Sequence, residues 1–181
     1  MPPRPQLSAE HATMLMRAAL DEASRGLVEG EAPIGCVIAR PSRSGFEIVG
    51  RAHNRVTGLR RKTAHAEMLA LEDGAGRVDR AGPDLVLVST LEPCIMCFSA
   101  CIASAIATVV YGLAAPADSG ADRVRPPDTP GASMPGITSG TLAYESRRLF
   151  RAFVRRGSGA PDALAYAEQL LALTAGLTRA A

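Results

Sequence analysis

The chain has 181 residues, enough for one domain with a sizeable hydrophobic core. Hydrophobic residues make up 47% of the chain and charged residues 21%, a balance that is too apolar for a disordered protein. The formal net charge of +2 excludes a histone-like basic protein, although it leaves room for a local basic patch.

Periodic apolar residues and turn residues divide the chain into alternating helices and strands. The first element is an amphipathic helix, which Ser8 caps and Gly30 ends. Thr63 is expected to cap a second helix. The other predicted elements are strands over residues 33–39, 46–52, 84–90 and 107–111, helices over 94–105 and 141–156, a turn over 41–45, and a long loop over 115–136 that holds five prolines. Strands that alternate with helices predict an α/β layered sheet.

The C-terminal part of the chain begins with a segment rich in glycine, serine and proline. Residues 157–161 are predicted to be a linker, and the leucines that follow it predict a last helix, either docked on this chain or swapped onto a partner. The N-terminus has no apolar segment of the kind found in signal peptides, so we expect a reducing, cytoplasmic location.

Residues 93–117 carry no charge and are numerous enough to suggest a membrane span. The run contains proline, serine and glycine, and its pattern changes midway from helical to strand-like. A buried helix followed by a buried strand has the same hydropathy, so we expect no membrane partner.

One histidine and two cysteines, His65, Cys94 and Cys97, have a spacing that suits a metal site. Cys94 and Cys97 stand three residues apart at a predicted helix start, which points both sulfurs to one side and favours the thiolates that bind metal. His65 opens another helix and can supply a third ligand, leaving one tetrahedral zinc position for water, as in catalytic zinc sites. Zinc lowers the pKa of such a water to about 7, and Glu67, two residues beyond His65, can take and return its protons.

Other interpretations of these residues stay open. Cys94 and Cys97 could form a redox pair, or the zinc site could be purely structural, although Glu67 would then have no use beside the metal. Cys36 and Cys101 are predicted core thiols. His53 could line a pocket, but a surface or structural role is favoured. Glu92 is expected to make local hydrogen bonds.

The order His-x-Glu followed by Pro-Cys-x-x-Cys is the signature of zinc deaminases, and the chain resembles the cytidine deaminase-like superfamily. Within that superfamily it is most similar to the bacterial tRNA adenosine deaminase group. The similarity runs from about residue 9 to residue 156 and is carried by segments 31–35, 53–55, 63–67, 90–97 and 137–145. It implies a three-layer α/β/α sandwich with a mixed sheet of about five strands. Residues 1–156 would form the deaminase domain, and residues 157–181 a linker and helical extension.

The resemblance also implies roles for single residues. One Zn²⁺ per subunit would be bound by His65, Cys94 and Cys97, and Glu67 would be the catalytic proton shuttle. Asn54 matches the family asparagine that contacts the substrate base or sugar. The other positions assigned to substrate binding are Pro33, Ile34 and Ala66. Members of the superfamily usually assemble, so a homodimer is expected.

The match to the tRNA enzymes is broken just after Gly112. Those enzymes usually carry an Asp and then a Lys-Thr-Gly segment there, whereas in this chain Ala or Pro replaces the acid and the lysine is missing. Because that segment helps to hold the target nucleotide, the departure favours a free nucleobase or nucleoside as substrate, with a purine such as guanine or adenine preferred. The alternatives are adenosine-to-inosine deamination at the tRNA wobble position and a non-catalytic deaminase-like binding module.

Two basic clusters bear on tRNA as a possible partner. One is residues 60–62, immediately before His65, and the other is a set of arginines on the late helix, most of them predicted on one side. In the tRNA enzymes the equivalent helix helps to grip the anticodon stem, whereas the simpler interpretation is a solvated helix face. The arginines of this set are Arg147, Arg148, Arg151, Arg155 and Arg156.

Overall fold

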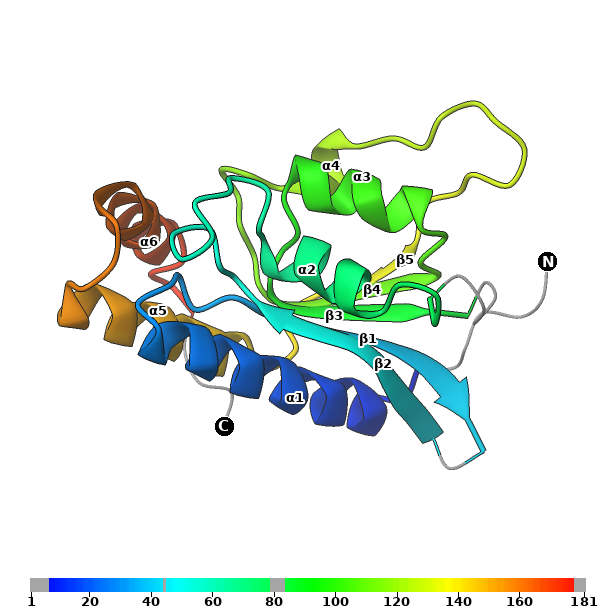
Figure 1. The fold of residues 1–181 in the computed structure, drawn as a ribbon, viewed down its shortest axis with the longest axis horizontal. Coiled ribbons are helices and arrows are strands. Elements are labelled where there is room, and N and C mark those ends of the chain that lie inside the picture. The colour runs from blue at the N-terminus through cyan, green and yellow to red at the C-terminus, as the bar shows by residue number, and fades with distance from the viewer. Residues whose placement is uncertain (1–6, 44, 79–83, 178–181) are drawn as a thin grey trace.

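The computed structural model describes residues 7–43, 45–78 and 84–177 (Figure 1). Residues 1–6, Ser44 of the predicted turn, residues 79–83 and residues 178–181 of the predicted extension lie outside these ranges. The helices are α1 (Ala9–Val28), α2 (Ala66–Asp73), α3 (Ile95–Ala103), α4 (Gly120–Arg123), α5 (Ala143–Arg156) and α6 (Pro161–Leu173). The strands are β1 (Gly35–Ser42), β2 (Gly45–His53), β3 (Val86–Leu91), β4 (Thr108–Leu113) and β5 (Gly136–Thr138).

The strands form one mixed sheet in the order β2-β1-β3-β4-β5. β1 pairs antiparallel with β2 and β3, whereas β3, β4 and β5 run parallel. Parallel neighbours need a crossover, and α3 supplies the one between β3 and β4 (Figure 1). The fold is therefore the predicted α/β class with a mixed five-strand sheet.

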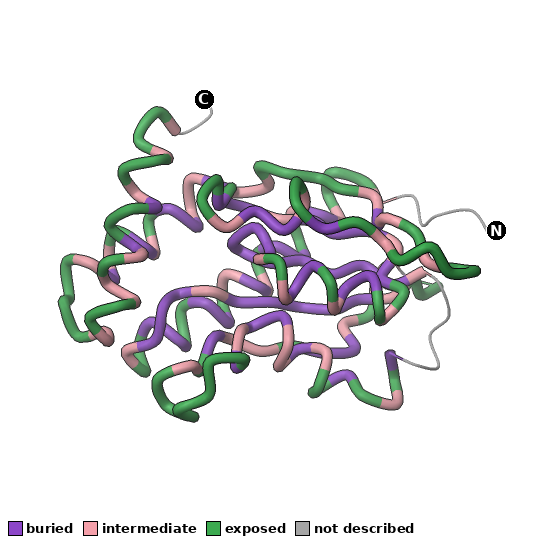
Figure 2. Tube along the Cα trace, turned by 90° about the horizontal axis from the view of Figure 1, so that it is seen from above, coloured by how far each residue is buried: buried purple, intermediate pink, exposed green. Residues whose placement is uncertain are grey.

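Helices cover both faces of the sheet. α1 and α5 lie on one face, and α2, α3 and α4 lie on the other (Figure 1). Leu15 and Met16 of α1 pack with Val88 of β3 on the first face, while Phe98 of α3 packs with Leu87 on the second. Every residue of β3 is buried, and Figure 2 shows that the buried stretches of the chain run through the middle of the molecule. This two-sided cover explains why the central strand is almost wholly apolar.

Close packing on β1 depends on a glycine. A Cβ atom on Gly35 would lie 2.0 Å from the Ala19 carbonyl oxygen of α1, a distance that no side chain can occupy. The Gly35 N–H donates to the Thr90 hydroxyl of β3 at 3.0 Å, so this buried donor has a partner. The absence of a side chain thus lets α1 press against the strand whose start borders the site described below.

One predicted helix start was wrong. Thr63 does not cap α2, because that helix begins at Ala66 with His65 at the N-cap position. The Ala64 carbonyl accepts a hydrogen bond from the Arg55 N–H at 3.0 Å, which ties Ala64 to the preceding loop. The tertiary contact of this loop therefore starts the helix two residues later than Thr63 would have done.

The predicted turn at residues 41–45 was too long. β1 continues through Pro41 and Ser42, and Gly45 already belongs to β2. Pro41 pairs only with Phe46 of β2, since the pairing of β1 with β3 stops at Ala39. A proline fits there because only one side of the strand still has a neighbour.

The long segment 115–136 is not a plain loop, because it contains the short helix α4 (Gly120–Arg123), which the sequence analysis missed. β5 then begins at Gly136, the last residue of the predicted loop. Ser119 caps α4 by accepting a hydrogen bond from the Asp122 N–H at 3.2 Å. β5 has only three residues and pairs with β4 at the edge of the sheet.

The last predicted helix is α6, and it docks on its own chain. Ala167 and Leu170 of α6 share a buried cluster with Phe150 and Phe153 of α5. Among the described residues, no helix is both long and apolar enough to cross a membrane, and the uncharged run 93–117 proves to be the predicted helix followed by the predicted strand.

Candidate active site

Three side chains from two helix starts meet at one end of the sheet. His65 is the N-cap residue of α2, and Cys94 is the N-cap residue of α3, with Cys97 one turn further on. The His65 Nδ1 lies 3.7 Å from the Cys94 Sγ and 3.6 Å from the Cys97 Sγ, and the two sulfurs are 3.6 Å apart. The structure thus brings together the three residues that the sequence predicted as metal ligands.

These separations can be compared with the edges of a zinc tetrahedron. Zn–S bonds of about 2.3 Å and Zn–N bonds of about 2.0–2.1 Å at tetrahedral angles place two sulfurs about 3.8 Å apart and sulfur and nitrogen about 3.6 Å apart. The observed triangle of His65, Cys94 and Cys97 has nearly these edges, and its ligand atoms all lie within 4.8 Å of one another. The donor set fits zinc and presents three protein ligands.

The two cysteines are hydrogen-bonded to each other through their sulfurs. The hydrogen bond between Cys94 and Cys97 is the main cause that lowers the pKa of the Cys94 thiol to about 4, with His65 adding to the effect. The same bond raises the pKa of Cys97, and burial raises it further. A thiolate is therefore already stabilised at the start of α3, where the free N–H groups of the helix also favour negative charge.

Glu67 lies in the first turn of α2 and is buried, with 3% of its surface exposed. Its Oε1 accepts a hydrogen bond from the Ser89 hydroxyl of β3 at 2.8 Å. Burial raises the pKa of the Glu67 carboxyl, although Ser89 and His65 partly oppose this effect. A buried carboxyl group with a raised pKa is suited to carry protons near neutral pH.

His65, Glu67 and Cys94 open into one pocket of about 250 Å³. Its walls come from the loop after α1, the loop after β2, the start of α3, the segment after β4, and α6. The remaining lining residues are Glu31, Ala32, Ile34, Asn54, Val56, Thr57, Lys62, Leu91, Glu92, Asp118, Asp162, Ala163 and Tyr166.

Of the residues predicted to bind substrate, Asn54 and Ile34 line this pocket. Pro33 and Ala66 do not line it and are buried in the structure. Ala66 is nevertheless the residue between His65 and Glu67, so its backbone stays close to the cluster.

Several pocket residues were not predicted from the sequence. Asp118 lies in the segment where an acid seemed to be lost, yet it lines the pocket, and burial together with the charge of Cys94 raises its pKa. Tyr166 belongs to α6 and is far from the zinc motif in sequence. Its pKa is raised, chiefly by burial. No local pattern announces either residue, because only the docking of their segments brings them to the pocket.

Cys36 and Cys101 are the core thiols that were predicted, whereas the hydrogen bonds of Glu92 reach distant residues and are not local. The Glu92 Oε2 accepts from the Ala115 N–H at 2.9 Å, and its Oε1 accepts from the Ser119 hydroxyl, so Glu92 ties the segment after β4 to the start of α3. Cys36 and Cys101 are fully buried in the core between the sheet and the helices α2 and α3.

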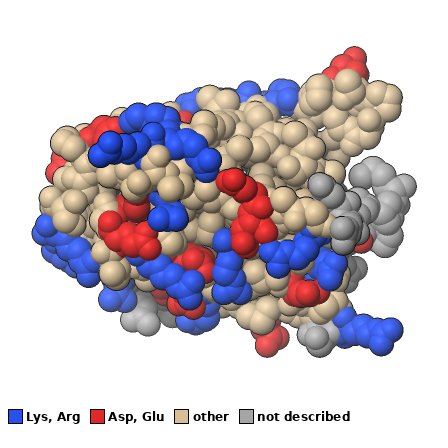
Figure 3. All heavy atoms as spheres, viewed as in Figure 1, with Lys and Arg blue, Asp and Glu red and all other residues tan. Residues whose placement is uncertain are grey.

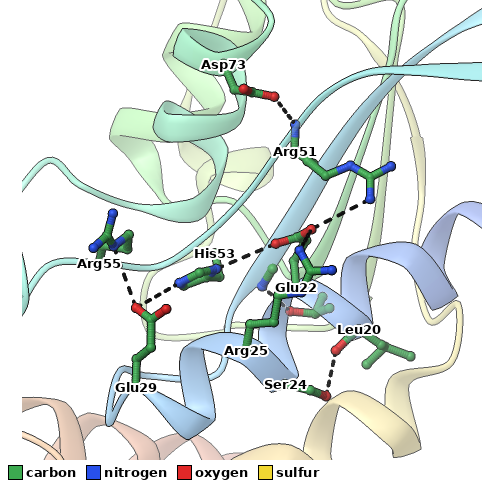
Figure 4. A network of polar contacts seen from close by, with 11 residues as sticks. Leu20, Glu22, Ser24, Arg25, Glu29, Arg51, His53, Arg55 and Asp73 are labelled. Carbon is green, nitrogen blue, oxygen red and sulfur yellow. Dashed lines mark hydrogen bonds and ion pairs between the residues drawn. The ribbon is translucent and has the colours of Figure 1, made fainter.

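His53 belongs to a network of polar contacts with acidic and basic side chains (Figure 4). Its Nδ1 lies 3.6 Å from the Glu22 carboxylate and its Nε2 lies 3.2 Å from Glu29. Arg25 and Arg51 also pair with Glu22, at 3.0 and 3.9 Å. The network joins α1 to the end of β2, directly before Asn54, which agrees with the structural role favoured for His53.

Several side chains of the two basic clusters are paired with acidic residues or buried within the chain. Lys62 pairs with Asp162 of α6 at 2.9 Å, and Arg61 pairs with Glu72 at 3.3 Å. Arg147 was expected on the exposed side of the late helix, but it is buried and donates to the Leu171 carbonyl at 3.0 Å, because the end of α6 covers it.

Three of the other late arginines lie beside an open groove. Arg148, Arg151 and Arg155 line a groove of about 520 Å³ that residues of α1 also border. On the face shown in Figure 3, basic groups gather at the end of the molecule that carries α5 and α6, mixed with acidic groups. The role of these arginines in binding tRNA stays a prediction.

Comparison with known proteins gives a consistent match. Residues 9–113 match the family described as the cytidine and deoxycytidylate deaminase zinc-binding region. The tRNA-specific adenosine deaminase of Streptococcus pyogenes serotype M18 is 34% identical over 153 residues, which covers 83% of this chain and 94% of the relative. The tRNA(Ile)-lysidine synthase of Thermus thermophilus is 52% identical over 97 residues, but the chain spans only 17% of the length of that protein.

Solved structures agree with the fold. A structure from a study of A-to-I editing by tRNA:A34 deaminases at the wobble position has a TM-score of 0.64 and 30% identity, and the match covers 76% of this chain and 99% of the other. The guanine deaminase from Nitrosomonas europaea has a TM-score of 0.64 and 24% identity, with 78% and 83% of the two chains covered, and this likeness shows the fold alone.

Proposed function

The chain belongs to the cytidine and deoxycytidylate deaminase zinc-binding family, and from this premise we propose that it is a hydrolytic deaminase that acts on an adenosine of transfer RNA. One observation carries the proposed chemistry. The buried Glu67 carboxyl group and the His65–Cys94–Cys97 cluster face the same pocket, so a proton carrier stands beside a complete set of zinc ligands.

The proposed division of labour follows from the geometry. His65, Cys94 and Cys97 would hold the zinc ion, which supplies the activation of water for hydrolysis. Glu67 accepts a proton from the attacking water and returns it to the departing amine. The hydrogen bond that Glu67 accepts from Ser89 fixes the carboxylate in the pocket. The pocket walls surround the site of this exchange and would orient the amine-bearing ring.

The relatives support tRNA as the substrate. The Streptococcus pyogenes protein, named a tRNA-specific adenosine deaminase, matches this chain over 94% of its own length, and the matched solved structure comes from a study of tRNA:A34 deaminases. The exposed arginines Arg148, Arg151 and Arg155 offer positive charge to an RNA backbone.

A free nucleobase or nucleoside is the second candidate, and one specific observation favours it. α6 supplies Asp162, Ala163 and Tyr166 to the pocket wall, and the Lys62–Asp162 ion pair lies at this wall. The pocket volume of about 250 Å³ is below the range of roughly 300–1,000 Å³ that is typical of sites for drug-sized ligands. A wall of this kind suits a small substrate better than a nucleotide held within a stem-loop.

A substrate panel tests both candidates. We would measure ammonia release by the zinc-loaded protein from adenine, guanine, cytosine, their nucleosides, and an anticodon stem-loop with adenosine or guanosine at the wobble position. Formation of inosine in the adenosine stem-loop, without turnover of any free base or nucleoside, would establish the tRNA activity. Turnover of a free base or nucleoside, without turnover of either stem-loop, would establish the second candidate.

The same panel addresses the non-catalytic alternative. A protein that binds zinc and RNA but releases no ammonia from any substrate would be a binding module, and the proposed activity would be wrong. Steep weakening of RNA binding with salt would show that the arginines contact phosphates. The predicted homodimer and the predicted cytoplasmic location stay predictions.

A further inference from the structure

Glu31 is a buried carboxylate at the pocket wall, with 3% of its surface exposed. Three N–H donors converge on its two oxygens. The Oε2 accepts from the Asn54 Nδ2 at 3.1 Å and from the Thr57 N–H at 3.2 Å, and the Oε1 accepts from the Gly58 N–H at 2.6 Å. The side chain therefore binds both Asn54 and the loop that follows β2.

The lack of a side chain at residue 58 permits this contact. A Cβ atom on Gly58 would lie 3.3 Å from the Glu31 Oε1, which is tighter than nine in ten real Cβ contacts. The loop can thus bring its backbone N–H group up to the carboxylate.

The chemistry of a carboxylate determines how the Asn54 amide is turned. An ionised carboxylate only accepts hydrogen bonds, so the Asn54 NH₂ group must face Glu31 and the Asn54 carbonyl must face away. Among the described residues, the bond to Glu31 is the one side-chain hydrogen bond of Asn54, and no buried side-chain polar atom lacks a partner. Because Asn54 lines the pocket, its Oδ1 is left facing the open space.

We propose that Glu31 is a positioning residue that holds the Asn54 carbonyl toward the substrate, so that the substrate group facing Asn54 is a hydrogen-bond donor. This inference rests on the proposed function, since Asn54 meets a substrate only if the pocket is the active site. It narrows the substrate contact to an N–H or O–H group, such as a ribose hydroxyl or a ring N–H.

The orientation can be tested without turnover. The side-chain amide signals of Asn54 in ¹⁵N NMR spectra are identified by their loss in Asn54→Asp. Glu31→Gln keeps the size of the side chain but introduces an amide that can donate to Asn54, so we expect the Asn54 signals to shift and their protons to exchange faster. Glu47→Gln, which removes an exposed carboxylate paired with Arg40, is the matched control and should leave the signals unchanged.

The donor can be identified with substrate pairs that differ by one N–H or O–H group. The pairs are adenosine and guanosine with their 2′-deoxy and 3′-deoxy forms, adenine and guanine with their 9-methyl forms, and the stem-loop with and without one 2′-deoxyadenosine at the target. In the wild-type protein, removal of one donor should lower kcat/KM at least tenfold. In Asn54→Ala and in Glu31→Gln the same removal should change kcat/KM less than threefold.

The ratio of kcat/KM between the two members of a substrate pair separates positioning from a merely structural role. If Glu31 only stabilises the loop, Glu31→Gln lowers kcat/KM for both members of a pair and keeps the wild-type ratio, which would overturn the proposal. Unchanged Asn54 signals in Glu31→Gln would overturn it as well. If the wild-type protein releases no ammonia from any substrate, the proposed function fails, and the NMR result alone then decides the orientation of Asn54.

Discussion

The substitution Glu67→Gln separates the catalytic role of this residue from its effect on folding. Glutamine has the same size, and its carbonyl oxygen can still accept the hydrogen bond from Ser89. The zinc content should therefore stay at the wild-type level. Without an ionisable group to carry the proton, ammonia release should fall about 10²- to 10⁴-fold, the usual contribution of general acid–base catalysis.

Although Glu67→Gln lowers ammonia release, it should stabilise the folded state of the metal-free protein. Burial raises the pKa of Glu67 in the folded state above the value of about 4.3 found in unfolded chains. As the pH rises through this window the unfolded state loses its proton first, so the carboxyl group disfavours folding by about 1.36 kcal/mol for each pKa unit of difference. Glu67→Gln removes this cost and should raise the Tm at pH 7, and the gain should vanish below about pH 4.

Glu22→Gln is the matched control, because Glu22 is equally buried but pairs with Arg25 and Arg51 away from the pocket. It should lower the Tm and leave ammonia release at the wild-type level. Thermal unfolding in the presence of a chelator, zinc analysis and the ammonia assay check the three expectations. More than about 1% residual activity in zinc-loaded Glu67→Gln would refute the assigned proton transfer.

Four other substitutions, one of them a control, test the site and its supports. Cys97→Ala should remove most of the bound zinc, whereas Cys101→Ala, which changes a core thiol of the same helix, should retain it; equal zinc contents would contradict the ligand assignment. Thr90→Val leaves the buried Gly35 N–H without an acceptor and should cost about 1–3 kcal/mol, seen as a lower midpoint of urea unfolding. Tyr166→Ala opens the α6 wall and should raise the ratio of stem-loop to free-base turnover; an unchanged ratio would show that α6 does not select the substrate.

The zinc ligands and the central layers could be predicted from the sequence because they depend on local order. Cys94 and Cys97 lie one turn apart at a helix start, and His65 and Glu67 share another, so spacing alone sets each pair. The family signature predicted that the two pairs meet, because His65 and Cys94 stand 29 positions apart. The apolar run at β3 likewise announces a strand that is covered on both faces. Errors arose where tertiary contacts moved a boundary, as at Thr63, which the loop contact of Ala64 displaces from the helix start.

The pocket walls were decided by the tertiary structure alone. Glu31 reaches Asn54 across 23 positions of the sequence, and Lys62 reaches Asp162 across 100, distances over which no periodic pattern extends. In the sequence, nothing distinguishes Arg147 from the exposed arginines of the same helix, whereas in the structure the end of α6 covers it. Residue spacing along one or two helical turns therefore determined the chemistry of this protein, whereas the packing of distant segments decided the shape of its pocket and which atoms face a substrate.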